Sequence, residues 1–429
     1  MKRLVVLLLL GCLIGLLLGA IPGVQAAKGP IEIIYYSWDD PANKPIVDAF
    51  NASQKEIFVK ATYLPSAEFE TKMVTLLAGG ATVDCYMQKR QPNIFQEVAN
   101  GTIEPLDKYI TKYKYDLETI KPYLSQVAVN GKVAAIPFRG AGYYTYYNKK
   151  LFAAAGQPTP AEYVAKGQWT WDKFAEVARK MSSGDGKQYG AFLHSWPQLT
   201  FLPAIQEGVD FITTDGGVDL NAKSLLYSLR MRKSFEKEKV IIPLAEINAS
   251  RLHYSTAFYN GNVAMMPMGE WFPGFMISGR NNKLLKGFTW NDYGITRLPC
   301  NTPNYITMGQ CTFNHVAARS KKKDAAFKFI AWMGSAEGGQ VAAKAGLLPS
   351  VIDDKVMAVL AESVPDKESL RYLTESVPVK AQWFHKWGSK LETQVLNPLL
   401  SGYLSSEQND GDFIAELEKG CKELIKSTK

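Results

Sequence analysis

Ile31-Glu32-Ile33-Ile34-Tyr35-Tyr36 is an apolar run that predicts a β-strand, which ends at the polar stretch Ser37-Trp38-Asp39-Asp40. The pattern continues as helix, strand, helix, strand and helix over residues 45–51, 58–63, 67–78, 83–87 and 94–100. This alternation predicts an α/β fold with a mostly parallel sheet covered by helices. Ligands of such sheets bind beyond the carboxyl ends of the strands, which here are Ser37-Trp38-Asp39 and Gln88-Lys89-Arg90.

Length and composition restrict the class of protein. The chain has 429 residues, of which 46% are hydrophobic and 21% charged, and this balance excludes a disordered chain, a collagen-like repeat and a multi-pass membrane protein. Such a length predicts two lobes or domains. With 49 Lys+Arg against 41 Asp+Glu, the net charge of +8 is mild and spread along the chain, so nucleic acid is not an expected partner.

The N-terminus has the layout of a secretory signal peptide. Lys2 and Arg3 precede an apolar run over 4–18, and small residues follow before an expected cleavage after Ala26. The run is about 15 residues long, short of the roughly 20 that span a bilayer as a helix. A retained anchor and a lipoprotein box at Leu9–Cys12 are the alternatives, although the apolar run continues beyond Cys12. We therefore expect an exported protein, in the periplasm or on the outer face of the cytoplasmic membrane.

From residue 132 the chain predicts a second α/β unit. Strands are indicated at 133–138 and 143–147, with a further strand at 189–192 that belongs to a second sheet. Another strand, 262–266, ends at Met268-Gly269-Glu270-Trp271. Neither an internal repeat nor a long linker is present in the sequence, so the lobes are expected to be joined by short crossovers.

Cysteine and histidine spacing does not predict a metal site. The four cysteines of the mature chain lack a CxxC pair, and the four histidines are scattered, so neither a metal nor another cofactor is expected. Cys300 and Cys311 flank a Pro/Asn turn, and their spacing is compatible with a local disulfide or with two free thiols.

Catalytic motifs are also lacking in the sequence. It contains no GxGxxG after a strand and no GxxxxGK[ST], HExxH or GxSxG. Asp39, Asp40, Asp84 and Glu270 could supply the carboxylate pair of a glycoside hydrolase. Hydrogen bonding and turn formation are the simpler roles for these carboxylates. We therefore expect a protein that is not an enzyme, with an exported carbohydrate-active enzyme as the alternative.

Aromatic and charged residues near strand ends predict a binding site. Sugar rings stack their apolar faces on aromatic rings, while their hydroxyls need polar partners. Trp38-Asp39, Trp196 and Glu270-Trp271 place three tryptophans at such positions. Core packing is the alternative role for each. Lys89, Arg90 and Arg139 add cations at strand ends, either to bind a ligand or as solvated charges.

A series of motifs resembles the extracellular solute-binding proteins of ABC importers, in the sugar-binding family that includes maltose-binding protein. The order of the motifs, rather than any single one, is specific, and it covers nearly the whole mature chain. The motifs are Ile31–Trp38, Lys44–Phe50, Tyr63–Gly80, Val83–Asp84, Asn100–Asp107, Gly131–Pro137, Tyr146–Phe152, Trp169–Phe174, Phe258–Trp271, Lys323–Phe329, Gly346–Pro349 and Asn397–Gly402.

This resemblance implies a two-lobed periplasmic-binding-protein fold with a ligand cleft between the lobes. After the signal peptide of residues 1–26, lobe 1 would comprise 27–138 and 290–346, and lobe 2 would comprise 139–289 and 347–429. The hinge would be crossed near 136–142, 287–293 and 345–350. The closed form of a monomer would deliver a carbohydrate to membrane permease subunits that a cytoplasmic ATPase drives. A chemoreceptor without a transporter is a further alternative.

The resemblance also suggests ligand contacts. Trp271 matches the stacking Trp of the family, Trp38 and Asp39 lie in its first-strand loop, and Trp383 or Trp387 would be a late aromatic contact. Lys89 and Arg90 stand where many members carry a small or acidic polar residue. That departure leaves open an acidic sugar or a sugar phosphate as well as a neutral one, because Arg pairs well with carboxylates.

Overall fold

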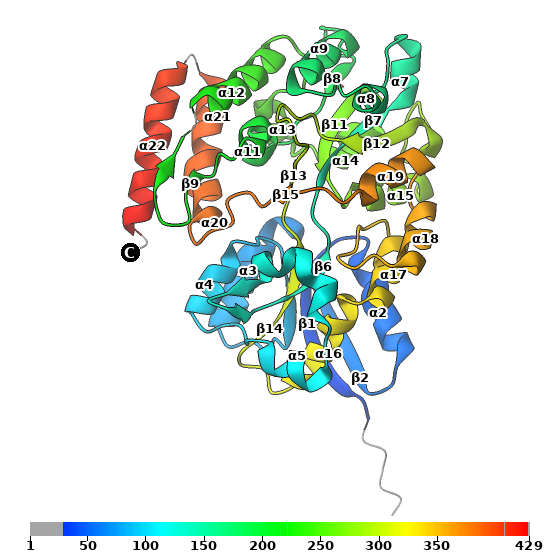
Figure 1. Cartoon of the computed structure of the whole chain (residues 1–429), viewed down its shortest axis with the longest axis vertical. Coiled ribbons are helices and arrows are strands. Elements are labelled where there is room, and N and C mark those ends of the chain that lie inside the picture. Colours follow the sequence, from blue (N-terminus) through cyan, green and yellow to red (C-terminus); the bar gives the residue numbers. More distant parts are fainter. Residues whose placement is uncertain (1–28, 221, 407, 428–429) are drawn as a thin grey trace, which may run out of the picture.

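The chain folds into two α/β lobes, each around its own sheet (Figure 1). The structure, a computed structural model, describes residues 29–220, 222–406 and 408–427. The predicted signal peptide and the alternative lipoprotein box at Cys12 lie outside these residues. Within the described ranges, no helix combines the length and apolar character that a bilayer crossing requires. The mixed α/β, two-lobed architecture predicted from the sequence is confirmed.

The first lobe contains the N-terminal strands. β1 lies parallel to β2 and β3, as the strand–helix alternation predicts, whereas β14 from late in the chain pairs antiparallel with β3 and β6. The sheet order is β2 (Ile57–Leu64), β1 (Ile31–Trp38), β3 (Cys85–Gln88), β14 (Thr312–Val316) and β6 (Ile136–Arg139). Its main helices are α2 (Asn43–Ser53), α3 (Phe69–Ala78), α4 (Asn93–Ala99), α5 (Asp107–Tyr113) and α16 (Lys323–Met333).

The second lobe is larger and more helical. β7 and β11 are antiparallel neighbours at the centre of its sheet, and every residue of both strands is buried. The sheet order is β12 (Tyr293–Arg297), β7 (Tyr143–Asn148), β11 (Val263–Gly269) and β8 (Tyr189–Ala191). Its main helices are α7 (Lys149–Ala154), α8 (Pro160–Ala165), α9 (Trp171–Met181), α11 (Leu202–Gln206), α12 (Ala222–Lys237), α13 (Leu244–Ser250), α14 (Tyr254–Tyr259), α15 (Phe272–Asn281), α18 (Asp354–Glu362), α19 (Lys367–Thr374), α21 (Asn397–Ser405) and α22 (Asp410–Ser427).

Three segments pass between the two sheets. The first joins β6 to β7 through residues 140–142, and the second joins β12 to β14 through the short strand β13 (Thr307–Met308). The third follows α17 (Ala336–Lys344), which contributes Ala342 to the first core and Ala343 to the second. These segments touch each other, because Gly140 N donates to Leu348 O at 2.8 Å and a Cβ on Gly309 would lie 2.7 Å from Gly142 N.

The second passage differs from the expectation. The family resemblance implies that residues 290–297 belong to the first lobe, but β12 pairs with β7 in the second sheet, from Tyr293 opposite Asn148 to Arg297 opposite Tyr144. The chain therefore leaves the second sheet after Arg297 and not near 287–293. A strand pattern identifies a strand but does not say which of two sheets it joins.

The third passage is packed against α15 at a glycine-to-glycine contact, and we expect this contact to limit substitution. Gly346 has φ of +79°, and a Cβ there would lie 2.6 Å from Gly274 N and Cα. Gly346→Ala should therefore lower the free energy of unfolding by about 2–4 kcal/mol, through backbone strain and overpacking together. Gly287→Ala is the matched control, because Gly287 has φ of +73° with nothing within 4 Å.

Urea unfolding of the two variants measures the difference. The control should lose only about 1 kcal/mol, from the left-handed backbone alone. Equal losses in the two variants would show that the contact with Gly274 is not important for stability.

The four cysteines of the described chain are all free thiols, so no Cys300–Cys311 bridge is present in these residues. The two cysteines lie on either side of the second passage. Cys300 N donates to Trp169 O in the second lobe, whereas Cys311 N donates to the Gln126 side chain in the first. Proximity in the sequence therefore does not bring the two sulfur atoms together.

Candidate functional site

Most of the predicted site residues lie at strand ends that meet between the lobes. Trp38 ends β1 and Arg139 ends β6 in the first lobe, while Glu270 and Trp271 follow β11 in the second. The ring of Trp271 packs against the apolar cores of both lobes. The hydrogen bond from Glu270 N to Gly142 O, 3.0 Å long, ties the end of β11 to the first passage.

Arg139 is the centre of a buried charge network. Its Nη2 donates to Asp40 Oδ2 at 3.1 Å and to Asn43 Oδ1 at 2.8 Å, and its guanidinium lies 5.5 Å from the centre of the Trp38 ring. Asn43 Nδ2 in turn donates to Ser37 Oγ and to Trp38 O. Only 2% of Arg139 is exposed, and its Nε has no hydrogen-bond partner. Among the described residues, the buried Nε–H of Arg139 is therefore a donor without an acceptor.

Glu270 is buried next to this network. Burial raises its pKa to about 8, against the opposing effect of the Arg139 charge, and the Asp40 charge adds to the rise. At neutral pH the carboxyl group is therefore mostly protonated, and it can donate as well as accept a hydrogen bond.

We expect Glu270 to make stability depend on pH. Between the unfolded value of 4.5 and the folded value of about 8, the folded protein holds a proton that the unfolded chain has released. Rising pH therefore destabilises the folded state across this window, by at most about 1.4 kcal/mol per pH unit. In Glu270→Gln that contribution disappears, so the variant should gain stability relative to the wild type as the pH rises from 5 to 8.

Urea unfolding at pH 5, 6, 7 and 8 measures this difference, with the exposed Glu416→Gln as the control. The control should follow the wild type at every pH. A constant difference between Glu270→Gln and the wild type would contradict the assignment.

An aromatic group forms the second side of the site. The rings of Trp271 and Tyr143 are 5.6 Å apart edge to face, and those of Trp271 and Trp196 are 6.0 Å apart. Trp271 Nε1 donates to Tyr254 Oη at 3.1 Å. The indole of Trp271 lies over Gly269, where a Cβ would come within 2.1 Å of the ring, so the glycine at the end of β11 makes room for it.

Two histidines border the aromatic group without adding charge at neutral pH. The His194 ring lies 4.6 Å from that of Trp196, and the His253 ring lies 4.0 Å from that of Tyr254. Burial lowers the pKa of His194 to about 3 and also lowers the pKa of His253. This side of the site is therefore uncharged, which suits the apolar face of a sugar ring.

The predicted cations are held by protein acceptors. Lys89 Nζ donates to Ser66 Oγ at 2.7 Å and also contacts Ser66 O, and Arg90 Nη1 lies 2.9 Å from Glu392 Oε2 in the other lobe. Asp39 is exposed at the end of β1. Each of the three cations that the sequence indicates, Lys89, Arg90 and Arg139, is thus already paired with oxygen acceptors.

Trp383 is not part of the aromatic group. It is 2% exposed, belongs to the core of the second lobe, and has its ring 5.9 Å from that of Phe211. Its Nε1 has no hydrogen-bond partner. Its assignment as a ligand contact stays a prediction.

The structure adds residues to the site that the sequence did not single out. Asn43 completes the Arg139 network, Tyr143 and Tyr254 complete the aromatic group, and Glu392 pairs with Arg90. Gln198 Oε1 and Glu70 Oε1 are buried acceptors with no hydrogen-bond partner in the described part of the chain. The sequence signal that could have pointed to Tyr143 as a site residue is the run of tyrosines at 143–147, which by its pattern predicts only a strand.

The arrangement offers hydrogen bonding and stacking. No group of three or more His, Cys, Asp or Glu that could hold a metal ion occurs among the described residues. Asp84, one candidate for a hydrolytic carboxylate, is buried directly before β3, where it accepts from Ile34 N at 2.8 Å and from Ser320 Oγ at 2.5 Å. That is the structural role the sequence also allowed.

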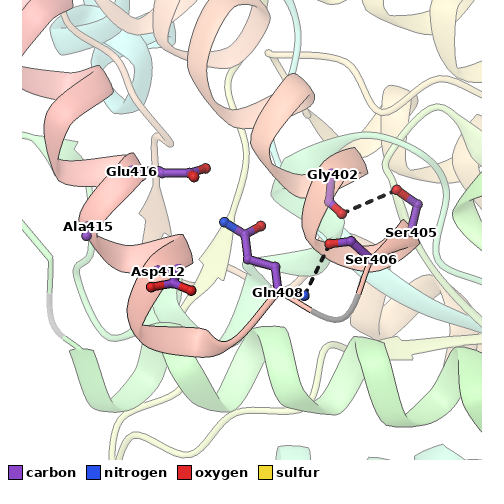
Figure 2. A pocket seen from close by; sticks show the side chains of 7 residues that line it. All are labelled: Gly402, Ser405, Ser406, Gln408, Asp412, Ala415 and Glu416. Atoms are coloured by element: carbon purple, nitrogen blue, oxygen red, sulfur yellow. Dashed lines mark hydrogen bonds between the residues drawn. The ribbon is translucent and has the colours of Figure 1, made fainter.

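A separate hollow of about 610 Å³ lies on the outside of the second lobe (Figure 2). The end of α21 and the start of α22 line it, with Ser406 Oγ accepting from Gln408 N at 3.2 Å. Its lining is Gly402, Ser405, Ser406, Gln408, Asp412, Ala415 and Glu416. This hollow has no aromatic ring to stack on a sugar, and the sequence-predicted residues are elsewhere.

Three known proteins that resemble this chain are named as binding or sugar-transport proteins. A mannitol-binding protein of Pseudomonas aeruginosa is 34% identical over 97 residues, which span 22% of this chain and only 20% of that protein. A sugar transporter from Rhizobium etli, solved in an open conformation, has a TM-score of 0.74 and 27% identity over 91% of this chain and 99% of that one. An ABC substrate-binding protein from Listeria monocytogenes in complex with cycloalternan has a TM-score of 0.77 and 21% identity over 93% and 99%.

The sequence profile of one family matches residues 45–354, more than half of the chain. The match spans segments of both lobes and all three passages between them. The chain therefore belongs to the bacterial extracellular solute-binding proteins, the family that its motifs predict.

Proposed function

We propose that the protein is the substrate-binding component of an ABC-type carbohydrate importer. It would hold a sugar or an oligosaccharide between the lobes and deliver it to the membrane permease. The observation that carries the proposal is the pairing of the Trp271 aromatic group with the buried polar network of Arg139. A sugar presents an apolar ring face and a rim of hydroxyls, and this site offers a surface for each.

The charges around the site favour a neutral ligand over an acidic one. Lys89, Arg90 and Arg139 all have protein partners, and Glu270 is mostly uncharged at neutral pH. An anionic ligand would have to displace one of these partners. Relatives named for mannitol binding or solved with cycloalternan are consistent with a polyol or a neutral sugar.

The three passages lie side by side and would act as a hinge about which the two lobes close on a ligand. A ligand that contacts Arg139 on one lobe and Trp271 on the other binds the closed form better, and so shifts the population toward it. The closed monomer would then dock on the permease pair outside the cytoplasmic membrane, after export with loss of the signal peptide. A chemoreceptor role without a transporter predicts no permease or ATPase gene beside this one.

The hydrolase alternative needs two free carboxylates across one glycosidic bond. Asp84 is engaged within the first lobe, and Asp40 is paired with Arg139. Turnover of a sugar polymer that Glu270→Gln abolishes would favour the hydrolase, whereas reversible binding without turnover favours the importer component.

Thermal unfolding of the mature protein against neutral sugars, polyols, uronates and sugar phosphates tests the proposal. A ligand at a hundredfold excess over its Kd stabilises the folded state by about 2.7 kcal/mol, which raises Tm by a few degrees. We expect such a rise with at least one neutral sugar or polyol. If Tm stays constant across the whole panel, the protein does not bind carbohydrate.

A further inference from the structure

One segment of the second lobe reaches across to the end of β3 in the first. Arg90 Nη1 and Glu392 Oε2 are 2.9 Å apart, and the rings of Phe95 and Phe384 have centres 5.1 Å apart. Between these contacts, a Cβ on Gly388 would lie 3.1 Å from Pro92 Cβ. The segment over 384–392 therefore covers the turn after β3 and the start of α4 through an ion pair, a ring contact and close backbone packing.

The ion pair is an interlobe contact. Arg90 follows β3 in the first sheet, whereas Glu392 lies in the π-helix η4 (Leu391–Leu396), whose Leu391 and Val395 are part of the core of the second lobe. The two side chains are 28% and 20% exposed. A partly buried pair is less screened by water than a surface pair, so the loss of one partner should matter.

This pair borders the proposed sugar site. β3 is the parallel neighbour of β1, with Tyr36 opposite Tyr86, so Arg90 follows β3 at the same edge of the first sheet at which β1 ends in Trp38. On the first lobe, burial raises the pKa of Glu70, and the charge of Arg90 opposes that rise. Burial lowers the pKa of Lys89, and the charge of Arg90 adds to that fall. Glu392 is thus paired with a cation at the sheet edge that also carries Trp38.

We propose that Glu392 determines the charge selectivity of the site, by occupying Arg90 and so excluding anionic sugars. The inference rests on the proposed carbohydrate-binding function and deepens it. A ligand carboxylate competes with Glu392 for the same guanidinium, and the two like charges repel. Without the Glu392 charge, Arg90 is left partly buried and unpaired, and a ligand carboxylate can take both of its terminal N–H groups.

Glu392→Gln tests the inference with matched ligand pairs. Calorimetric titration with D-mannitol and D-mannonate, and with maltitol and maltobionate, compares neutral and acidic forms of similar shape. In the wild type, the neutral member of the preferred pair should bind at least tenfold more tightly. In Glu392→Gln that ratio should shift by tenfold or more toward the acidic member.

Three further variants test whether the change in selectivity depends on the Arg90–Glu392 pair. The double variant Arg90→Gln/Glu392→Gln should lose the gain, because the cation that attracts the carboxylate is gone. Glu418→Gln removes a glutamate from an exposed pair with Lys422 on α22, and it should keep the wild-type ratio. Arg90→Gln alone leaves Glu392 unpaired, so it should discriminate against the acidic member at least as strongly as the wild type does.

The outcomes separate this inference from the proposal on which it rests. If the wild type binds a neutral member and Glu392→Gln leaves the ratio unchanged, Glu392 does not set selectivity, although the protein still binds carbohydrate. An equal gain in the double variant would also overturn the inference. If the wild type binds none of the four ligands, and no other neutral sugar or polyol raises its Tm, the proposed function itself fails.

Discussion

Replacing Trp271 by Ala is expected to weaken sugar binding about 100-fold, which corresponds to about 2.7 kcal/mol. The indole is only partly buried, contacts Tyr143 and Trp196, and is oriented by its hydrogen bond to Tyr254. It also packs against the cores of both lobes. The substitution therefore removes a stacking surface for the ligand and a contact that favours the closed form.

Calorimetric titration with the sugar that gives the largest rise in Tm measures the loss. Trp271→Phe should lose less, because a ring remains while the hydrogen bond to Tyr254 is gone. Trp290→Ala is the matched control, since Trp290 packs on Tyr293 and on Arg280 away from the site. An affinity of Trp271→Ala within threefold of the wild type would remove Trp271 from the site.

Local patterns in the sequence were sufficient for the strands and helices of the first lobe up to residue 99. The strand predicted at 31–36 is β1 over Ile31–Trp38, and the helix predicted at 45–51 is α2 over Asn43–Ser53. Both elements show the spacing of buried residues that their periodicity predicts, such as Ile46, Val47 and Phe50 on α2. Alternation of strands and helices also predicted the parallel order of β1 with its neighbours.

Contacts between segments that are distant in the sequence could not be predicted from local patterns. β14 inserts antiparallel between β3 and β6, and β12 joins the second sheet, because pairing is decided by tertiary packing that a single strand does not encode. For the same reason, the sequence predicted cations at Lys89, Arg90 and Arg139 but not their partners. Glu392 lies about 300 residues after Arg90 in the chain, and nothing in its local sequence distinguishes it from a solvated helix residue.

The four tryptophans that the sequence suggested as ligand contacts differ in where they lie in the structure. Trp38, Trp196 and Trp271 follow or end predicted strands, and all three are partly buried at the place where the lobes meet. Trp383 had no such strand end to anchor its assignment, and it lies in the core of the second lobe. A tryptophan at a predicted strand end is therefore partly buried near the boundary of the lobes, whereas Trp383, which had no predicted strand end, is a core residue.

Arg139→Met is expected to lower the free energy of unfolding by about 3–5 kcal/mol, the largest loss of stability that we predict. The guanidinium is buried between Asp40, Asn43 and the Trp38 ring, so its loss leaves the Asp40 carboxylate and the Asn43 carbonyl without their donor. The charge of Arg139 also opposes the rise in the pKa of Glu270. Without it, that pKa should rise further, and the carboxyl group should stay protonated to higher pH.

Urea unfolding of Arg139→Met, Arg139→Met/Asp40→Asn and Arg230→Met separates a buried pair from an exposed one. The double variant should recover part of the loss, because it no longer buries an uncompensated carboxylate. Arg230 pairs with Asp410 at 2.6 Å on the surface with 65% of its side chain exposed, so Arg230→Met should cost less than about 1 kcal/mol. Equal losses for Arg139→Met and Arg230→Met would show that the buried network does not hold the end of β6 in place. In that case Arg139 could be assigned to ligand binding alone, and sugar affinity rather than stability would report its removal.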